Sequence, residues 1–169
     1  MNRFHVSGVI LSAFFSPVIF FAEIPVTEEN HIQSDGDTYS IEEKTCLYKT
    51  IYGEARSESP IGQELVATVI LNRVENENYP NTICGVVKQK RQFSMWEDHN
   101  LYVTEKAFSQ STYSKEVLQA IDAGMRAIER ERKLLPKTSL HYHADYVSPK
   151  WSKSMNRYAQ ADSHIFYMN

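Results

Sequence analysis

The chain of 169 residues carries 18 basic and 21 acidic side chains, which gives a formal net charge of −3. This length favours a single domain, and a hydrophobic share of 42% is ordinary for a globular protein. The weakly acidic balance lacks the basic stripe of a nucleic-acid-binding protein, and two cysteines are too few for a disulfide-framework miniprotein.

Residues 1–22 have the order of a secretory signal peptide. Arg3 precedes an apolar segment over residues 6–21, and Ala22 stands just before the first acidic residue. A basic start, an apolar core and a small final residue are typical of export signals. Retention as a membrane anchor is the alternative, because Phe20 departs from the small residue usual near a cleavage site. Either way the sequence predicts export to the periplasm, the extracellular space or the cell wall, with a membrane contact only in the anchored form.

Residues 23–39 are polar and show no periodic apolar face, which predicts a flexible leader. The pattern changes at Ser40, which fits a capping box with Glu43, and a helix is predicted from there to about Ala55. In such a box the serine oxygen accepts one backbone N–H and the glutamate reaches back to another. The folded domain is therefore predicted over residues 40–169.

Export places Cys46 and Cys84 in an oxidising compartment, where an isolated pair of cysteines is more often bridged than free. A disulfide closing a loop of this length contributes about 4 kcal/mol in the chain-entropy description. Two buried thiols acting as small apolar side chains are the alternative.

Three further helices are predicted. The Ser-Pro pair at residues 59–60 is a favourable helix start, and the residues after it are apolar nearly all round, so this helix should be central and buried. A short helix is expected over 82–88. The apolar spacing of residues 117–128 predicts an amphipathic helix ending near Pro136. Residues 89–113 lack a clear period and are expected to form a long, partly ordered loop region.

The last part of the chain alternates between apolar and polar residues. This pattern predicts strands over 140–144, 158–161 and 164–167, the last two joined by a turn at Asp162-Ser163. Helices first and a small antiparallel sheet near the C-terminus predict a mainly helical α+β domain.

Glu54 is the strongest candidate for chemistry. At 100° per residue, Leu47, Ile51 and Glu54 fall within about 60° of one another on the first helix. An acid at the edge of an apolar face is costly to ionise, and the unpaired carbonyls at a helix C-terminus add to that cost. A carboxyl kept protonated near neutral pH is what a general acid requires. The structural alternative is a glutamate that reaches solvent or pairs with Arg56 or Arg73.

Several short motifs follow one another in an order that resembles a known family. They are Tyr52-Gly53-Glu54-Ala55-Arg56, Gly62-Gln63, Asn72-Arg73, Tyr79-Pro80-Asn81-Thr82-Ile83, Gln92-Phe93-Ser94, Tyr142-His143, Pro149-Lys150-Trp151 and His164-Ile165-Phe166-Tyr167. Together they resemble the SleB-type cell-wall hydrolase family, over about residues 46–167. The resemblance implies a lysozyme-like domain that cleaves the bond between N-acetylmuramic acid (MurNAc) and N-acetylglucosamine (GlcNAc) in peptidoglycan glycan strands. It implies no cofactor, and a monomer is the default expectation.

The resemblance also implies a role for Glu54, as the acid/base of a lytic transglycosylase. A glycosidase that uses water needs a second carboxylate, whereas a lytic transglycosylase closes a ring with the substrate's own 6-hydroxyl. Glu58, Glu97, Asp98 and Asp145 are possible second carboxylates, but no motif fixes any of them. The single-acid mechanism is therefore favoured over hydrolysis.

Six further residues are expected to bind substrate in the same groove: Gln92, Phe93, Ser94, Tyr142, His143 and Trp151. An amide, a ring and a hydroxyl together suit a sugar with hydroxyl and acetamido groups. For Phe93, insertion into the core is an equal alternative, and Trp151 could instead cover the sheet. A structural role is expected for Asn72 and Arg73.

Two positions depart from the family pattern. Glu64 replaces a usually apolar residue and is expected on an exposed edge of its helix. The Asp162-Ser163 turn replaces a commoner turn that contains glycine.

Two other functions stay open from the sequence. His141 and His143 share one side of a strand, and with His164, or with His31 and Asp35 upstream, they could form a zinc site. That pattern would indicate a zinc-dependent cell-wall peptidase or amidase. A non-catalytic glycan-binding module is the third possibility.

Overall fold

The computed structural model describes residues 38–96 and 98–168, with side chains for all of these except 98 and 99. The predicted signal peptide (1–22), nearly all of the leader (23–39) and the pair His31 and Asp35 lie outside the described residues. No helix within the described part of the chain has both the length and the apolar character needed to cross a membrane.

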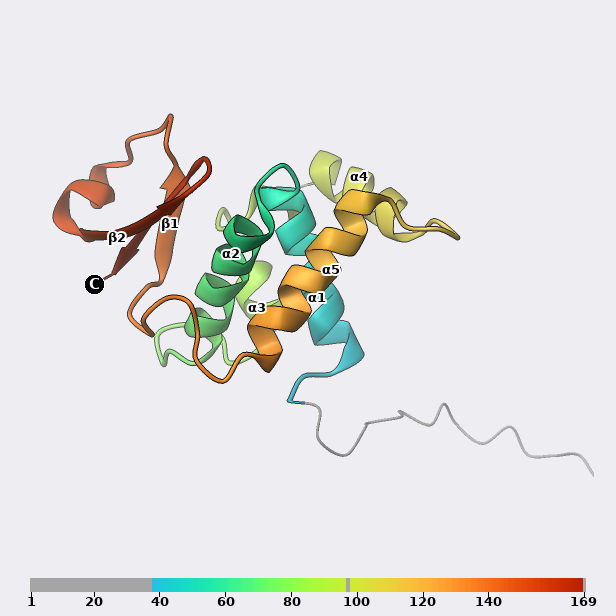
Figure 1. Cartoon of the computed structure of the whole chain (residues 1–169), viewed down its shortest axis with the longest axis horizontal. Helices are drawn as coiled ribbons and strands as arrows, with labels where there is room; N and C mark the ends of the chain where they lie inside the picture. The colour runs from blue at the N-terminus through green and yellow to red at the C-terminus, as the bar shows by residue number, and fades with distance from the viewer. Residues whose placement is uncertain (1–37, 97, 169) are drawn as a thin grey trace, which may run out of the picture. The chain divides into compact units, whose positions relative to one another are not determined.

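A group of helices comes first and a small sheet comes last, as the sequence predicted. The helices are α1 (Ile41–Ala55), α2 (Pro60–Val74), α3 (Ile83–Val87), α4 (Asp98–Phe108) and α5 (Lys115–Glu129), with short 3₁₀ turns η1 (Ser94–Trp96) and η2 (Lys150–Ser154). The strands are β1 (His141–Ala144), β2 (Asn156–Ala161) and β3 (His164–Met168). Figure 1 shows the sheet to one side of the helices. We call residues 141–168, which contain the sheet, the sheet lobe, and residues 41–129, which contain the helices, the helical body.

Hydroxyl side chains fix where the helices begin. Ser40 Oγ accepts a hydrogen bond from Glu43 N at 3.2 Å, and Ser59 Oγ accepts one from Gly62 N at 3.2 Å, so both predicted starts are confirmed. The other half of the predicted capping box differs, because Glu43 Oε1 accepts a bond from Cys84 N at 3.5 Å. The Glu43 carboxylate thus connects α1 to α3.

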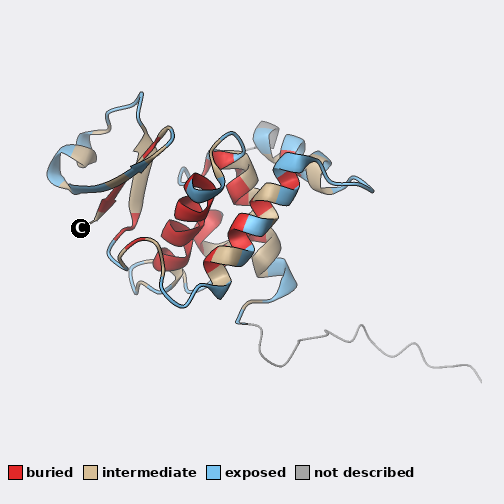
Figure 2. Cartoon of the chain, viewed as in Figure 1, coloured by how far each residue is buried: buried red, intermediate tan, exposed pale blue. Residues whose placement is uncertain are grey.

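The core is centred on α2, which is buried on all sides. Every residue from 62 to 73 is buried, and Figure 2 shows α2 in red along most of its length. Leu47 and Ile51 of α1 pack against it with no exposed surface. The nearly continuous apolar run in the sequence therefore predicted the central helix correctly.

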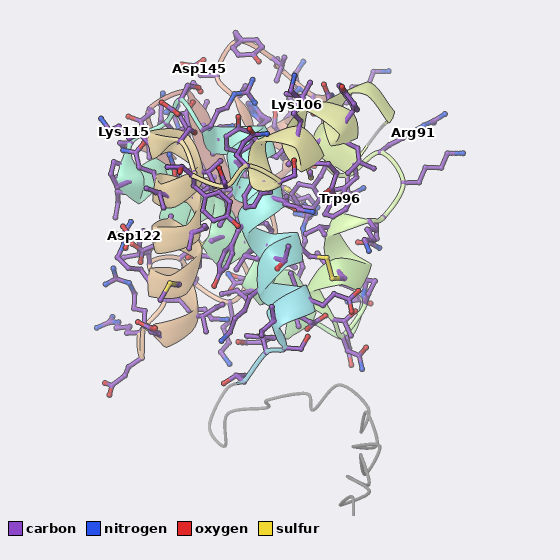
Figure 3. All side chains as sticks on the ribbon, turned by 90° about the vertical axis from the view of Figure 1, so that its right-hand side faces the viewer. Arg91, Trp96, Lys106, Lys115, Asp122 and Asp145 are labelled. Carbon is purple, nitrogen blue, oxygen red and sulfur yellow. A yellow bond between two sulfur atoms is a disulfide. The ribbon has the colours of Figure 1, made fainter. Side chains whose placement is uncertain are left out.

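A disulfide joins α1 to α3, as predicted. The sulfur atoms of Cys46 and Cys84 are 2.08 Å apart and their Cα atoms are 5.4 Å apart, which is ordinary bridge geometry. Figure 3 shows the bond in yellow between the two helices.

The loop region predicted over 89–113 is wrong, because this stretch contains η1 and α4. The inward side of α4 carries Leu101, Thr104 and Phe108, and Thr104 is buried. A threonine in the middle of the inward side hid the helical period. Phe108 meets the ring of Tyr52 on α1 edge to face, with the ring centroids 5.8 Å apart.

Helix α5 ends at Glu129, seven residues before Pro136, where the sequence predicted its end. The residue before a proline is disfavoured in helical conformation, and here that residue, Leu135, is buried in the core. Asn72 Nδ2 donates to the carbonyl oxygens of Pro136 and Ser139, at 2.8 and 3.1 Å. These contacts hold the segment in an irregular path that leads to β1.

The exposed position predicted for Glu64 is also wrong, since only 2% of its side chain is exposed. Two arginines account for the burial, one in the last turn of α5 and the other directly after that helix. Arg126 Nε lies 3.2 Å from Glu64 Oε2, and Arg130 Nε lies 2.5 Å from Glu64 Oε1. The carboxylate therefore pairs α2 with α5.

The three strands form an antiparallel sheet in the order β1-β3-β2, which confirms all three predicted strands. The turn between β2 and β3 is tied to the loop between α1 and α2. Glu58 accepts from Ser163 N at 3.0 Å and from Ser163 Oγ at 2.6 Å. Asp162 Oδ2 accepts from Ser59 N at 2.8 Å and from Ser59 Oγ at 2.6 Å.

This polar clamp, made of Glu58, Ser59, Asp162 and Ser163, explains the departure from the family's turn. Asp162 has a φ of 47°, a conformation that aspartate tolerates better than most residues. Its carboxylate comes so close to Gly62 that a Cβ there would lie 2.5 Å from Oδ2. The glycine is therefore required by the approach of the turn to α2.

Candidate active site

A cleft of about 720 Å³ lies where the end of α1 meets the segment before η1 and the strand β1. Its lining residues are Gly53, Glu54, Arg73, Arg91, Gln92, Ser94, His141, Tyr142, His143, Ala144, Tyr146, Val147, Trp151 and His164. Glu54 and all the residues expected from the sequence to bind substrate line this one cleft, except Phe93. The helical body and the sheet lobe therefore each supply a wall.

Glu54 occupies the last turn of α1, beside the fully buried Leu47 and Ile51, as the helix periodicity predicted. Its Oε1 accepts hydrogen bonds from Ser94 Oγ at 3.2 Å and from Met95 N at 3.3 Å. Gly53 allows this approach, because a Cβ at that position would lie 2.3 Å from Met95 Cβ.

The surroundings of Glu54 favour its protonated form. Burial raises the pKa of the Glu54 carboxyl, and this outweighs the opposing effect of the hydrogen bonds from Met95 and Ser94. Neither arginine considered as an alternative partner binds it. Arg56 Nη1 lies 3.4 Å from the Gly53 carbonyl, and Arg73 is occupied elsewhere.

Arg73 fixes one wall of the cleft from within the core. Its Nε donates to the carbonyl of Leu140 at 2.8 Å, and its Nη1 donates to Gln92 Oε1 at 3.2 Å. Its guanidinium also lies 5.3 Å from the ring centroids of Tyr79 and of Phe93. These contacts support the structural role expected for Arg73, because they join α2, Gln92 and the start of β1.

Phe93 does not offer its ring to the cleft. Only 2% of the residue is exposed, and it belongs to the hydrophobic core. The structure thus corrects the expected role of Phe93 as an apolar floor for the sugar and agrees with the alternative of core insertion. Its burial below Arg73 places Gln92 and Ser94, on either side of it, in the cleft.

Tyr142 and His143 point to opposite sides of β1. Burial raises the pKa of the Tyr142 hydroxyl, and the negative charge of ionised Glu54 acts in the same direction, so this phenol stays protonated. The His143 ring is held by the Ala144 carbonyl and the Tyr167 hydroxyl, each 2.9 Å from one of its nitrogens.

Glu54 is the only carboxylate among the lining residues, all of which have described side chains. Glu58 is occupied in the polar clamp, and Asp145 does not line the cleft. The side chains of Glu97 and Asp98 lie outside the described part of the structure.

The strand register separates the histidines proposed as zinc ligands. Ala144 pairs with His164 across the antiparallel ladder, so His164 projects to the same face as Ala144 and Tyr142. His141 and His143 project to the other face, where both rings contact Trp151. Among the described residues no group of three histidine, cysteine or acidic side chains could hold a metal ion.

The sequence did not single out Met95, which bonds to Glu54, or three residues that line the cleft, Arg91, Tyr146 and Val147. Met95 acts through its backbone N–H, for which no side-chain pattern exists. Arg91 lines the rim, and Figure 3 shows it projecting outward ahead of η1. Tyr146 and Val147 follow β1 after one intervening residue, so the available signal was an apolar pair close to the end of a predicted strand.

A helical body, a small antiparallel sheet and a half-buried carboxyl in the cleft where they meet define a lysozyme-like domain. Comparison with known proteins identifies the family. A family model described as "Cell Wall Hydrolase" matches residues 57–167, a range that begins just after Glu54. The chain belongs to the cell wall hydrolase family.

Curated relatives carry the name spore cortex-lytic enzyme. The protein from Bacillus cereus is 30% identical over 128 residues, which make up 76% of this chain and 45% of that protein. The protein from Bacillus subtilis is 28% identical over 120 residues, covering 71% of this chain and 35% of that protein. The chain thus spans less than half the length of these relatives.

Two solved structures share the fold. The catalytic domain of the germination-specific lytic transglycosylase SleB from Bacillus anthracis has a TM-score of 0.63 and 30% identity, covering 78% of this chain and 98% of that one. The catalytic domain of the Bacillus cereus SleB protein has a TM-score of 0.62 and 29% identity, covering 78% and 93%. The described domain therefore corresponds to nearly all of each solved catalytic domain.

Proposed function

We propose that this protein cleaves the MurNAc–GlcNAc bond of peptidoglycan as a lytic transglycosylase, with Glu54 as its single acid/base. One observation carries the proposal: among the described residues that line the cleft, Glu54 has the only carboxyl, and burial raises the pKa of that carboxyl. The similarity to SleB catalytic domains, one of which is named a lytic transglycosylase, supports the same assignment.

In the first step Glu54 donates its proton to the glycosidic oxygen. The bond from that oxygen to C1 of MurNAc breaks, and GlcNAc leaves as an alcohol while positive charge develops on C1. The Glu54 carboxylate formed in this step still accepts the hydrogen bonds from Ser94 and Met95, which stabilise its negative charge.

In the second step the 6-hydroxyl of the same MurNAc attacks C1. The Glu54 carboxylate takes the proton of that hydroxyl, a 1,6-anhydro ring closes, and Glu54 is restored in its acid form. No water is consumed and no second carboxylate is needed, which agrees with the composition of the cleft.

The other lining residues hold the strand in place. Gln92 and Ser94 offer an amide and a hydroxyl on one wall, and Tyr142 offers a protonated phenol on the other. Hydrogen bonds of these kinds suit sugar hydroxyl and acetamido groups. The proposal includes export of the protein, because its substrate lies outside the cytoplasm, and action as a monomer.

Mass spectrometry of digested peptidoglycan tests the reaction type. The expected products are muropeptides with a 1,6-anhydro end, one water lighter than the products of hydrolysis. Muropeptides with ordinary reducing ends would instead assign a hydrolase with a second carboxylate. A protein that binds peptidoglycan and releases nothing would be a glycan-binding module, and activity lost on chelation and restored by zinc would indicate a metalloenzyme.

A further inference from the structure

Sugar-binding clefts need apolar surface as well as hydrogen bonds, because the faces of a sugar ring carry C–H groups. The rings of Trp151, Phe93 and Tyr142, which the sequence predicted to contact the substrate, all have neighbours of their own. Trp151 packs between His141, His143 and Tyr167, with ring centroids 5.4 to 5.5 Å away. The ring of Phe93 is buried in the core.

Tyr142 is also occupied. Its ring meets that of His164 edge to face at 5.1 Å and that of Phe166 at 5.6 Å. These aromatic rings hold the sheet lobe together and present little free face to a ligand.

Tyr146 is the exception among the cleft-lining rings. It is 83% exposed, and the next residue, Val147, is 46% exposed. Among the described residues, no other ring and no cation packs against the ring of Tyr146, although it lines the same cleft as Glu54. The most exposed large apolar side chain in the described part of the chain thus lies at the catalytic cleft.

The backbone that carries Tyr146 is fixed on both sides. Asp145 N donates to the carbonyl of Ser163 at 2.7 Å, and Val147 N donates to the carbonyl of Ala144 at 3.0 Å. Asp145, labelled in Figure 3, marks the start of this segment at the outer edge of the molecule. An aromatic ring on an anchored backbone loses little conformational entropy when a ligand covers it.

We propose that Tyr146 is a specificity-determining residue whose ring stacks on a sugar of the glycan strand, away from the scissile bond. This inference rests on the proposed function and adds a subsite to it. The cleft then holds one sugar by hydrogen bonds beside Glu54 and another by apolar contact at the rim, so longer strands bind more tightly than short ones.

Binding to purified peptidoglycan tests this inference apart from catalysis. The full chain carrying Glu54→Gln serves as a non-cleaving parent, and Tyr146→Ala and Tyr146→Trp are added to it. We expect Tyr146→Ala to raise the Kd about five- to tenfold, the usual effect of truncating an aromatic contact residue, and Tyr146→Trp to retain the parent's affinity. Tyr102→Ala is the matched control, because Tyr102 is 67% exposed on α4 but does not line the cleft.

Strand length gives the second measurement. In the active chain, Tyr146→Ala should raise KM for long glycan strands and leave KM for the shortest cleaved fragments unchanged. Equal affinity of Tyr146→Ala and the parent, or an equal loss in Tyr102→Ala, would overturn the inference while leaving the proposed function in place. If the Glu54→Gln parent does not bind peptidoglycan and the chain with Glu54 restored does not cleave it, both the inference and the proposed function would be overturned.

Discussion

In the helical body the side chains that meet between α1, α2 and α5 are mostly apolar and fully buried, whereas the strands of the sheet lobe keep most of their side chains partly exposed. All four residues of β1 are half-buried, and four of the six in β2 are exposed. Figure 2 shows the same contrast between α2, which is mostly red, and the sheet, where β1 is tan, β2 is mainly blue and the red lies on β3. The body is stabilised by burial of apolar surface, and the lobe depends far more on ring contacts and hydrogen bonds.

The active cleft draws on both kinds of structure. Glu54 comes from the body, where apolar packing raises its pKa. Most of the opposite wall comes from the lobe, which is joined to the body by the polar clamp and by Arg73. A cleft built this way combines a carboxyl carried by the packed helical body with a wall whose position depends on a few polar contacts.

The largest effect is expected from removing the acid that the body contributes. Glu54→Gln should lower the rate of muropeptide release by about 10²- to 10⁴-fold, the usual contribution of a general acid. The amide keeps an oxygen that can accept from Ser94 and Met95, so circular dichroism should be unchanged.

Glu42→Gln is the matched control for this change, because Glu42 lies exposed on the same helix. It should retain full activity. An active Glu54→Gln protein would remove Glu54 from its assigned role, and equal losses in both variants would indicate a charge effect on the whole helix.

The second effect concerns the stability of the body. Replacing Cys46 and Cys84 together by serine should lower the free energy of unfolding by about 4 kcal/mol, because the bridge closes a long loop in the unfolded chain. Urea unfolding with and without reductant measures the difference. Reductant should have no effect on the double serine variant, and an oxidised wild type no more stable than that variant would contradict the prediction.

The same contrast explains how far the sequence could predict the fold. In the body, the apolar run of α2 and the hydroxyl caps at Ser40 and Ser59 are local signals, and both located their helices. Helix α4 was missed because a threonine, Thr104, stands at the centre of its inward side. Glu64 was misplaced because its burial depends on arginines more than sixty residues away in the chain.

The sequence predicted some residues of the candidate site correctly and others not. The helix periodicity placed Glu54 at the edge of the apolar face, and the motif order brought Gln92, Ser94 and Tyr142 to the same cleft. The burial of Phe93 could not be predicted, because residue type alone does not tell a sugar platform from a core ring. That the ring of Tyr146 packs against no other ring could not be predicted either, because this depends on the contacts that the other rings make in the fold.

A smaller effect should separate the lobe from the body. Glu58→Ala leaves the N–H and hydroxyl of Ser163 without their acceptor and should lower stability by about 1–3 kcal/mol. Hydrogen exchange should show faster exchange in β2 and β3 than in α2, because the lost contacts tie the lobe to the body. Activity should fall as the cleft wall moves.

Glu75→Ala is the matched control for the clamp. Its ion pairs with Lys133 and Lys137 are more exposed, and pairs of this kind contribute about 0–1 kcal/mol. Protection that falls equally in α2 and β3 of the Glu58 variant would mean that lobe and body unfold as one unit.

The smallest expected effect is the pH dependence of stability that Glu54 causes. Burial raises the pKa of Glu54 in the folded protein above its unfolded value of about 4.3. The proton is therefore bound more tightly in the folded state, and the stability it contributes is complete below the unfolded pKa and is lost as pH rises through the folded pKa. Each unit of difference between the two pKa values corresponds to about 1.4 kcal/mol.

Comparison with Glu54→Gln isolates this effect, since all other titrating groups are shared. The stability of the variant relative to wild type should rise from acidic to neutral pH, measured by urea unfolding at each pH. Activity of the wild type should fall over the same range as the acid loses its proton. A relative stability that falls with rising pH would mean that hydrogen bonds from Ser94 and Met95 outweigh burial, and the body would then stabilise a base in the cleft and not an acid.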